Sequence, residues 1–260
     1  METKYPIILV HGIMIKDLFF LKSFGQIDRI LRIEGFKVFK SKIDGVGTIE
    51  SNAEMLKQEI LGICGDLGVD KVNIIAHSKG GLDSKYMIQN LNMEDHVASF
   101  TTLCTPHKGS PMASWFLKWP RWMLKFLAFW IDFWYRLFGD KHPNSLKVCE
   151  QLALVDSIEK ESNIISDKIY CQSYSTTLKR SRDNFLMGIP LMFARHYEKD
   201  KSSDGLVSND SAKFGDYHGD AIDGSISHSD IIDLLANKKK KDRIYAFYSF
   251  ICEDLKNHGF

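Results

Sequence analysis

One segment constrains the fold of this chain most, because in it an apolar run leads straight into a glycine-rich turn and then a helix. The run Val72–Ala76 is followed by HSKGG (77–81), and helical spacing continues to Asn90. So sharp a turn has room only for small side chains two residues before and after the serine, where Ala76 and Gly80 stand. The turn would lift the Ser78 hydroxyl to the carboxyl end of a sheet, in front of a helix N-terminus. The pattern therefore predicts a reactive serine, with a strand, turn and helix around an ordinary serine as the alternative.

The rest of the chain alternates short apolar runs with amphipathic stretches. This alternation predicts an α/β fold with a mostly parallel sheet and helices on both faces. Strands are expected at Pro6–Val10, Phe36–Phe39, Val72–Ala76 and Val97–Leu103, near Lys168–Ser175 and near Phe185–Phe193. Helices are expected at Asn52–Cys64, at Gly80–Asn90 and near Leu146–Ile165.

Composition excludes several classes of protein. A chain of 260 residues with 44% hydrophobic and 26% charged residues is expected to form one domain over 1–260 with a well-buried core. The net charge of +1 offers no general positive field for nucleic acid. Five scattered cysteines without a CxxC pair are expected to be buried thiols. The N-terminus has no secretory signal, so a cytoplasmic location with association to a membrane is expected.

An aromatic segment from Trp115 to Phe138 contains all five tryptophans of the chain. Pro120 and interspersed charges argue against a membrane span and favour one or two amphipathic helices. Tryptophan mixed with lysine and arginine suits a water–lipid boundary, although a pair of core helices is the alternative. We expect a helical lid insertion at about 111–145. In water it should fold over Ser78 with its apolar face inward.

The N-terminal run Pro6–Val10 leads into His11-Gly12-Ile13, which predicts a second part of the site. A glycine after a buried strand lets backbone approach a substrate carbonyl. The amides of Ile13 and Lys79 are therefore candidate oxyanion donors, while His11 is expected to be structural.

Five stretches resemble the bacterial triacylglycerol lipases of the α/β-hydrolase superfamily, especially the Pseudomonas and Proteus type. They are YPIILVHG (5–12), KVNIIAHSKGG (71–81), TPHKGSP (105–111), RDNFL (182–186) and SDGLVS (203–208). TPHKGSP and SDGLVS are more specific to these lipases than the first two stretches, which many hydrolases share. The chain departs from the family in Ala76, in its more aromatic segment after TPHKGSP and in lacking a secretion signal.

A serine nucleophile needs a base, and the base needs an acid. In this fold the chain order is serine, acid, histidine. The resemblance implies Asp204 as the acid, although Asp-Gly is also a common turn. His228, on a loop before a helix, matches the family's histidine pattern, and His218 is the alternative base. His77 is expected to pack locally.

The resemblance also implies a structural calcium site near the histidine loop. Asp183 and Asp230 match its carboxylates, with backbone carbonyls from around Leu234 and Lys238. The alternative is that both are ordinary surface carboxylates. No organic cofactor is expected. The run Lys238–Lys241 is interpreted as a solvated helix end, or else as a contact with an anionic surface.

These features predict a serine-dependent carboxylic ester hydrolase, specifically a lipase that hydrolyses acylglycerols through an acyl-enzyme. A carboxylesterase or a phospholipid-directed acyl hydrolase is the alternative within the same class. An inactive hydrolase fold that binds membranes is the alternative outside it. The expected partners are a lipid or ester substrate and a lipid–water interface, with no nucleic acid.

Overall fold

A single sheet, in which all strand pairs of the described residues are parallel, organises the molecule. The structure, a computed structural model, describes residues 2–13, 22–158, 168–184, 187–188, 190–192, 202–234 and 236–260. The strand order is β2-β1-β3-β4-β5-β6. The strands are β1 (Ile7–Val10), β2 (Val38–Lys40), β3 (Val72–His77), β4 (Val97–Leu103), β5 (Tyr170–Ser175) and β6 (Asp216–Asp220). The predicted fold class is therefore confirmed.

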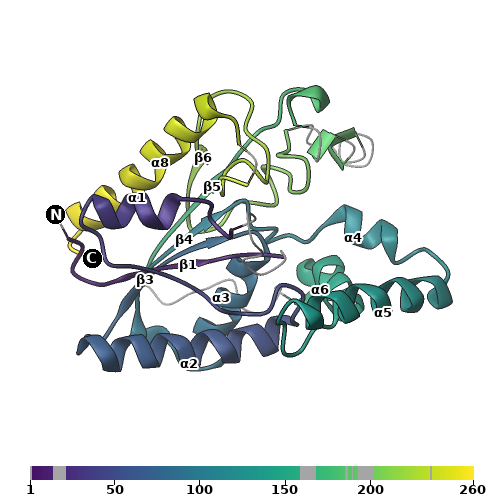
Figure 1. The fold of residues 1–260 in the computed structure, drawn as a ribbon, viewed down its shortest axis with the longest axis horizontal. Helices are drawn as coiled ribbons and strands as arrows, with labels where there is room; N and C mark the ends of the chain where they lie inside the picture. The colour runs from purple at the N-terminus through teal and green to yellow at the C-terminus, as the bar shows by residue number, and fades with distance from the viewer. Residues whose placement is uncertain are drawn as a thin grey trace.

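Helices cover both faces of the sheet because side chains alternate along each strand (Figure 1). On β1, Ile7 and Leu9 enter a core shared with α1 (Ile27–Ile33) and α8 (Lys238–Asn257). Ile8 and Val10 enter a second core, shared with α2 (Ile49–Leu67) and α3 (Lys79–Asn90). Because the central strands are buried on both sides, their carboxyl ends form a firm edge from which loops can present side chains.

Three helices between β4 and β5 lie beyond that carboxyl edge (Figure 1). They are α4 (Pro111–Phe116), α5 (Arg121–Leu137) and α6 (Ser145–Ile158). The Asp132 carboxylate on α5 accepts a hydrogen bond from the Ser145 amide at 2.7 Å. After α5, the amides of Lys141 and His142 donate to the Asp44 carboxylate. The C-terminal end of α5 is thus tied both to α6 and to the loop that follows β2.

The aromatic face of α5 is exposed, which differs from the expectation of a segment folded inward over Ser78. No residue of α5 is buried, and Trp122 and Phe129 are 74% and 64% exposed. The physical reason is that large apolar side chains surround most of this helix, but only one stripe of them can contact α6 and the neighbouring cavity. The other apolar side chains therefore remain exposed. Within the described residues, no helix is long and apolar enough to cross a membrane.

Two features of the structure differ from the prediction. The described residues within Phe185–Phe193 are helical, although a strand was expected there. Short apolar runs do not distinguish a buried strand from a buried helical turn, and Leu191 is fully buried in this one. The edge strand β6 was not predicted because its sequence, DYHGD, is polar. The predicted Leu146–Ile165 helix ends in the described residues at Ile158, and its remainder lies outside them.

Candidate active site

Ser78 lies at the sharp turn between β3 and α3, at the carboxyl edge of the sheet. Its φ of 54° is in the left-handed region, which is unfavourable for a residue with a side chain and is typical of strained functional turns. A Cβ on Gly80 would lie 2.4 Å from the His11 carbonyl oxygen and 2.8 Å from that of Val10, so the backbone at the end of β1 excludes any larger residue there. The tight turn predicted from Ala76 and Gly80 is therefore the turn observed.

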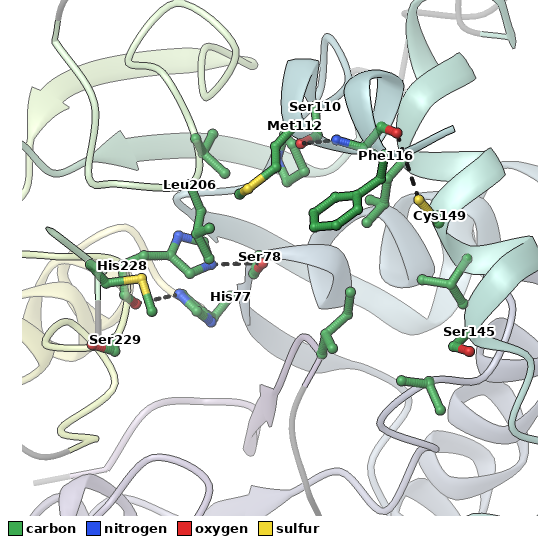
Figure 2. Close-up of a pocket in the computed structure, with 18 of the residues that line it drawn as sticks. His77, Ser78, Ser110, Met112, Phe116, Ser145, Cys149, Leu206, His228 and Ser229 are labelled. Atoms are coloured by element: carbon green, nitrogen blue, oxygen red, sulfur yellow. Dashed lines mark hydrogen bonds between the residues drawn. The ribbon is translucent and has the colours of Figure 1, made fainter. Parts of the chain in front are cut away.

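His228 and Asp204, from two separate loops, meet Ser78 in one hydrogen-bonded chain. Figure 2 shows the contact between His228 and Ser78. His228 Nε2 lies 2.9 Å from Ser78 Oγ, and His228 Nδ1 lies 2.6 Å from Asp204 Oδ2. The other carboxylate oxygen of Asp204 accepts hydrogen bonds from the amides of Leu206 and Val207 at 2.9 and 2.8 Å. The acid is thus oriented by the turn that follows it, and it fixes the histidine ring so that Nε2 faces the serine.

The alternative base, His218, lies on β6, where its ring stacks on Tyr174 and its Nε2 lies 3.5 Å from Asp216. No hydrogen bond joins His218 to Ser78 in the described residues. The structure therefore brings together the three residues that the sequence ranked first.

His77 supports the histidine loop, a role that the sequence did not reveal. Its Nε2 donates to the His228 carbonyl oxygen at 3.1 Å, and the two rings lie 4.5 Å apart. Burial, followed by the nearby charge of His228, holds the pKa of His77 well below its ordinary value of 6.5. A neutral His77 adds no second positive charge beside the ring of His228.

Cys104 lies behind the acid at the end of β4, with a φ of 51°. Burial, and then the negative charge of Asp204, raises the pKa of the Cys104 thiol well above its ordinary value. Among the described residues, Cys104, Asp204 and His228 are the group whose ligand atoms lie close enough to hold a metal ion. Asp204 and His228 already belong to the hydrogen-bonded series with Ser78, so the cluster is explained without a metal.

The candidate oxyanion donors flank the serine. A Cβ on Gly12 would lie 2.7 Å from Ser78 Cβ and 3.1 Å from the Lys79 nitrogen, so the HG loop packs directly on the turn. Ile13, the next residue, lines the cavity in front of Ser78. Gly12 is thus the residue that allows the two candidate amides, of Ile13 and Lys79, to lie near one another.

The side chain of Lys79 points away from this site into the protein. Its ammonium pairs with Asp83 at 2.6 Å, and both side chains are 1% exposed. Asp83 also accepts from Asn52 at 2.9 Å, and burial raises its pKa to about 6. Asn52 in turn donates to the Asp44 carbonyl. Polar contacts therefore run without interruption from the turn of Ser78 to the loop that holds the end of α5.

Ser78 and His228 open onto a cavity of about 570 Å³ whose walls are almost entirely apolar (Figure 2). Its lining includes Val46, Met112, Phe116, Ile131, Val148 and Leu206. Helices α4, α5 and α6 supply one wall, and the loops that carry the triad supply the other. The arrangement places a nucleophile beside an apolar cavity with room for a long apolar group.

Asp183 and Asp230 do not form the oxygen cage expected for calcium. Asp230 Oδ2 accepts from the Lys240 ammonium at 2.7 Å and from the Ser227 amide at 2.9 Å. The Asp183 carboxylate instead accepts from the Ser225 hydroxyl at 2.6 Å. The donors around Asp230 are hydrogen-bearing groups, which a cation repels, so this donor set does not fit a hard divalent ion.

Comparisons with known proteins agree with this fold. Residues 40–202 match the family model described as the alpha/beta hydrolase fold. Triacylglycerol lipase 2 of Saccharomyces cerevisiae is 28% identical over 90% of this chain and 73% of its own length. A triacylglycerol lipase of Pseudarthrobacter phenanthrenivorans is 35% identical, but over 43% of this chain and 36% of its own length.

Solved structures show the same fold at low identity. A metagenomic carboxyl esterase superposes with a TM-score of 0.75 at 13% identity, over 97% of this chain and 76% of its own. The lipase of Staphylococcus hyicus superposes with a TM-score of 0.70 at 15% identity, over 98% and 96%. With the family model matching more than half of its length, the chain belongs to the alpha/beta hydrolase fold family.

Proposed function

We propose that this protein is a serine-dependent ester hydrolase that acts as a lipase on acylglycerols with long acyl chains. The observation that carries the proposal is the hydrogen-bonded series Asp204–His228–Ser78, which opens onto an apolar cavity. Relatives named as triacylglycerol lipases and a structural neighbour named as a lipase support the same class of reaction.

The geometry supports a two-step acyl transfer. His228 Nε2 takes the proton of Ser78 Oγ as that oxygen attacks the ester carbonyl carbon. The Ile13 and Lys79 amides hold the resulting oxyanion, and Asp204 stabilises the imidazolium. Collapse of the tetrahedral intermediate breaks the ester bond, and His228 gives its proton to the departing alcohol. Water then repeats these steps on the acyl-enzyme, which releases the fatty acid and restores Ser78.

The cavity favours long apolar acyl chains over small polar esters. Its volume lies within the roughly 300–1,000 Å³ that ligand pockets commonly have. Its walls offer few polar partners beyond the catalytic groups, so selectivity would come from burial of hydrocarbon, worth about 0.8 kcal/mol for each CH₂.

The exposed aromatic face of α5 would place this cavity at a lipid surface. Trp122, Phe126, Trp130 and Phe133 are 74%, 59%, 44% and 49% exposed. Ile131 and Tyr135 of the same helix line the cavity. A helix that touches the cavity on one side and offers tryptophan and phenylalanine on another could rest in a lipid surface and admit substrate beside it. Lys118, Arg121, Lys125 and Arg136 would then lie among the headgroups.

The test replaces Trp122, Phe126, Trp130 and Phe133 together by serine. We expect hydrolysis of emulsified long-chain triacylglycerol to fall roughly ten-fold or more, because loss of one well-buried aromatic contact costs about that factor. Hydrolysis of a dissolved short-chain p-nitrophenyl ester should stay nearly unchanged. The melting temperature should also stay unchanged, because these side chains are exposed when no lipid is present.

The matched control is the double variant Ile33→Ser and Phe250→Ser. Both side chains are exposed apolar groups, at 75% and 58%, and they lie on α1 and α8, away from the cavity. Equal loss on emulsion and dissolved ester in the α5 variant would contradict the interfacial role and favour a carboxylesterase acting on soluble substrates. Preferential turnover of phospholipid vesicles would favour the phospholipid-directed alternative.

A further inference from the structure

The lysine run Lys238–Lys241 forms the first turn of α8, a place where positive charge is unfavourable. The first turn of a helix carries unpaired amide groups and the positive end of the helix dipole, so acidic residues are favoured there. The first turn of α8 has no acidic residue, and the Asn237 side chain caps it by accepting from the Lys240 amide. Lys238 and Lys239 are exposed, whereas Lys240 and Lys241 are half-buried. Two of the four lysines therefore have a role inside the protein.

Lys240 joins two segments that the resemblance placed around a metal ion. Its ammonium lies 2.7 Å from Asp230 Oδ2 and 3.4 Å from the Asp183 carbonyl oxygen. The Lys240 and Asp230 side chains are 15% and 3% exposed, so the pair is largely shielded from water. One positive charge thus connects the loop of His228 to the short 3₁₀ helix at Ser181–Asp183.

The remaining contacts of Asp230 complete its coordination by hydrogen bonds. The Ser227 amide donates to the same oxygen as Lys240, and Asn184 Nδ2 donates to the other at 3.4 Å. Asn184 Nδ2 also donates to the Ser227 hydroxyl at 2.7 Å. Calcium requires six to eight oxygen ligands at about 2.3–2.6 Å, whereas these partners of Asp230 are N–H groups.

We propose that the Lys240 ammonium takes the place of a structural divalent cation, so that this protein holds its His228 loop in position without calcium. Lys240 is then a positioning residue, because it acts on His228 through Asp230, which is two residues further along the same loop. The link to catalysis rests on the proposed function, whereas the link to stability does not.

Lys241 provides the matched control because it is the next residue on the same helix and forms an ion pair of similar length, but its side chain is 35% exposed, against 15% for Lys240. It lies 3.0 Å from Asp233, a carboxylate that also accepts from Tyr245 Oη at 2.7 Å and from the Gln26 amide at 3.2 Å. Removal of Lys241 therefore leaves Asp233 hydrogen-bonded to two other elements. Removal of Lys240 leaves Asp230, among the described residues, with donors from Ser227 and Asn184, and it also breaks the contact to the Asp183 carbonyl oxygen.

The experiment compares the full chain with Lys240→Met and Lys241→Met, each in EDTA and in millimolar CaCl₂. Methionine keeps most of the apolar stem and removes the charge. The wild-type melting temperature and ester hydrolysis should be the same in EDTA and CaCl₂. Lys240→Met should lower the melting temperature by roughly 5 °C or more. It should lower kcat on a dissolved ester more than it changes KM. Lys241→Met should change each quantity less and should not respond to calcium.

Three outcomes would overturn the proposal. They are a wild-type melting temperature that falls in EDTA or rises in CaCl₂, a Lys240→Met variant as stable and active as wild type, and a Lys241→Met variant with the larger loss. The wild-type measurement decides the question even if Lys240→Met does not fold. If no ester is hydrolysed but the melting temperatures follow the expected pattern, the proposed function fails and the structural role of Lys240 stands.

Discussion

The carboxyl edge of the sheet and helix α5 line the same cavity, yet their side chains are held in opposite ways. At the sheet edge, Asp204 and His228 are 1% and 6% exposed and bind neighbours from several loops. On α5, no residue is buried, and tryptophan and phenylalanine face solvent. The first region is positioned by the fold, whereas the second has apolar surface free to contact another apolar phase. In the proposed function, the first region performs the chemistry and the second meets the lipid surface.

The largest expected effect comes from removing the triad. Ser78→Ala or His228→Ala should lower ester hydrolysis by roughly three or more orders of magnitude while leaving a folded protein. Asp204→Ala should have a similar or smaller effect, because other groups can partly orient His228. Steady-state kinetics on a dissolved ester, with circular dichroism to check folding, measures this. Near-normal turnover in Ser78→Ala would show that the hydrogen-bonded series is not the catalytic one.

A second prediction concerns the buried ion pair of Lys79 and Asp83, which lies beside the turn of Ser78. Asp83→Asn should lower the free energy of unfolding by about 3–5 kcal/mol, because it leaves the Lys79 ammonium buried without a counter-charge. The double variant Lys79→Met with Asp83→Leu should recover most of this loss, which urea unfolding would measure.

The control for Asp83→Asn is an exposed ion pair of similar length. Lys108 and Asp210 lie 2.8 Å apart, but their side chains are 46% and 50% exposed. Asp210→Asn should therefore cost about 0–1 kcal/mol. Comparable losses in Asp83→Asn and Asp210→Asn would show that the buried pair adds no special constraint beside Ser78.

The smallest effect concerns pH. Burial holds the pKa of His107 well below 6.5, and its ring stacks on Phe214 at 4.6 Å. The unfolded chain therefore binds a proton below about pH 6.5 that the folded protein does not, so His107 contributes stability that is lost as pH falls below that value. The loss is at most about 1.4 kcal/mol for each pH unit.

The comparison that isolates this effect is between wild type and His107→Gln, by urea unfolding at about pH 8 and about pH 5.5. The raised pKa of Asp83 acts in the opposite sense in the acidic range and is common to both proteins. The variant should lose less stability than wild type between the two pH values. An equal loss in both proteins would mean that His107 does not stay neutral in the folded state.

Features that depend on a few neighbouring residues were predictable from the chain. The turn at Ser78 requires small side chains at two nearby positions, and Ala76 and Gly80 supply them. In a parallel sheet, the loops that follow the strands all lie at the carboxyl edge. Once the fold class is known, the chain order of Ser78, Asp204 and His228 follows from the order of these loops. The apolar central strands were recognisable for the same reason, since burial on both faces leaves a continuous apolar run.

Features that depend on contacts between distant segments were not predictable. The support of His228 by His77 joins residues far apart in the chain, and the inward turn of Lys240 toward Asp230 requires α8 to lie against the histidine loop. The exposure of the α5 aromatics depends on which stripe of the helix packs on α6. Local sequence sets what each side chain can do, but burial and charge pairing are properties of the surroundings, and the surroundings exist only once the segments have packed together.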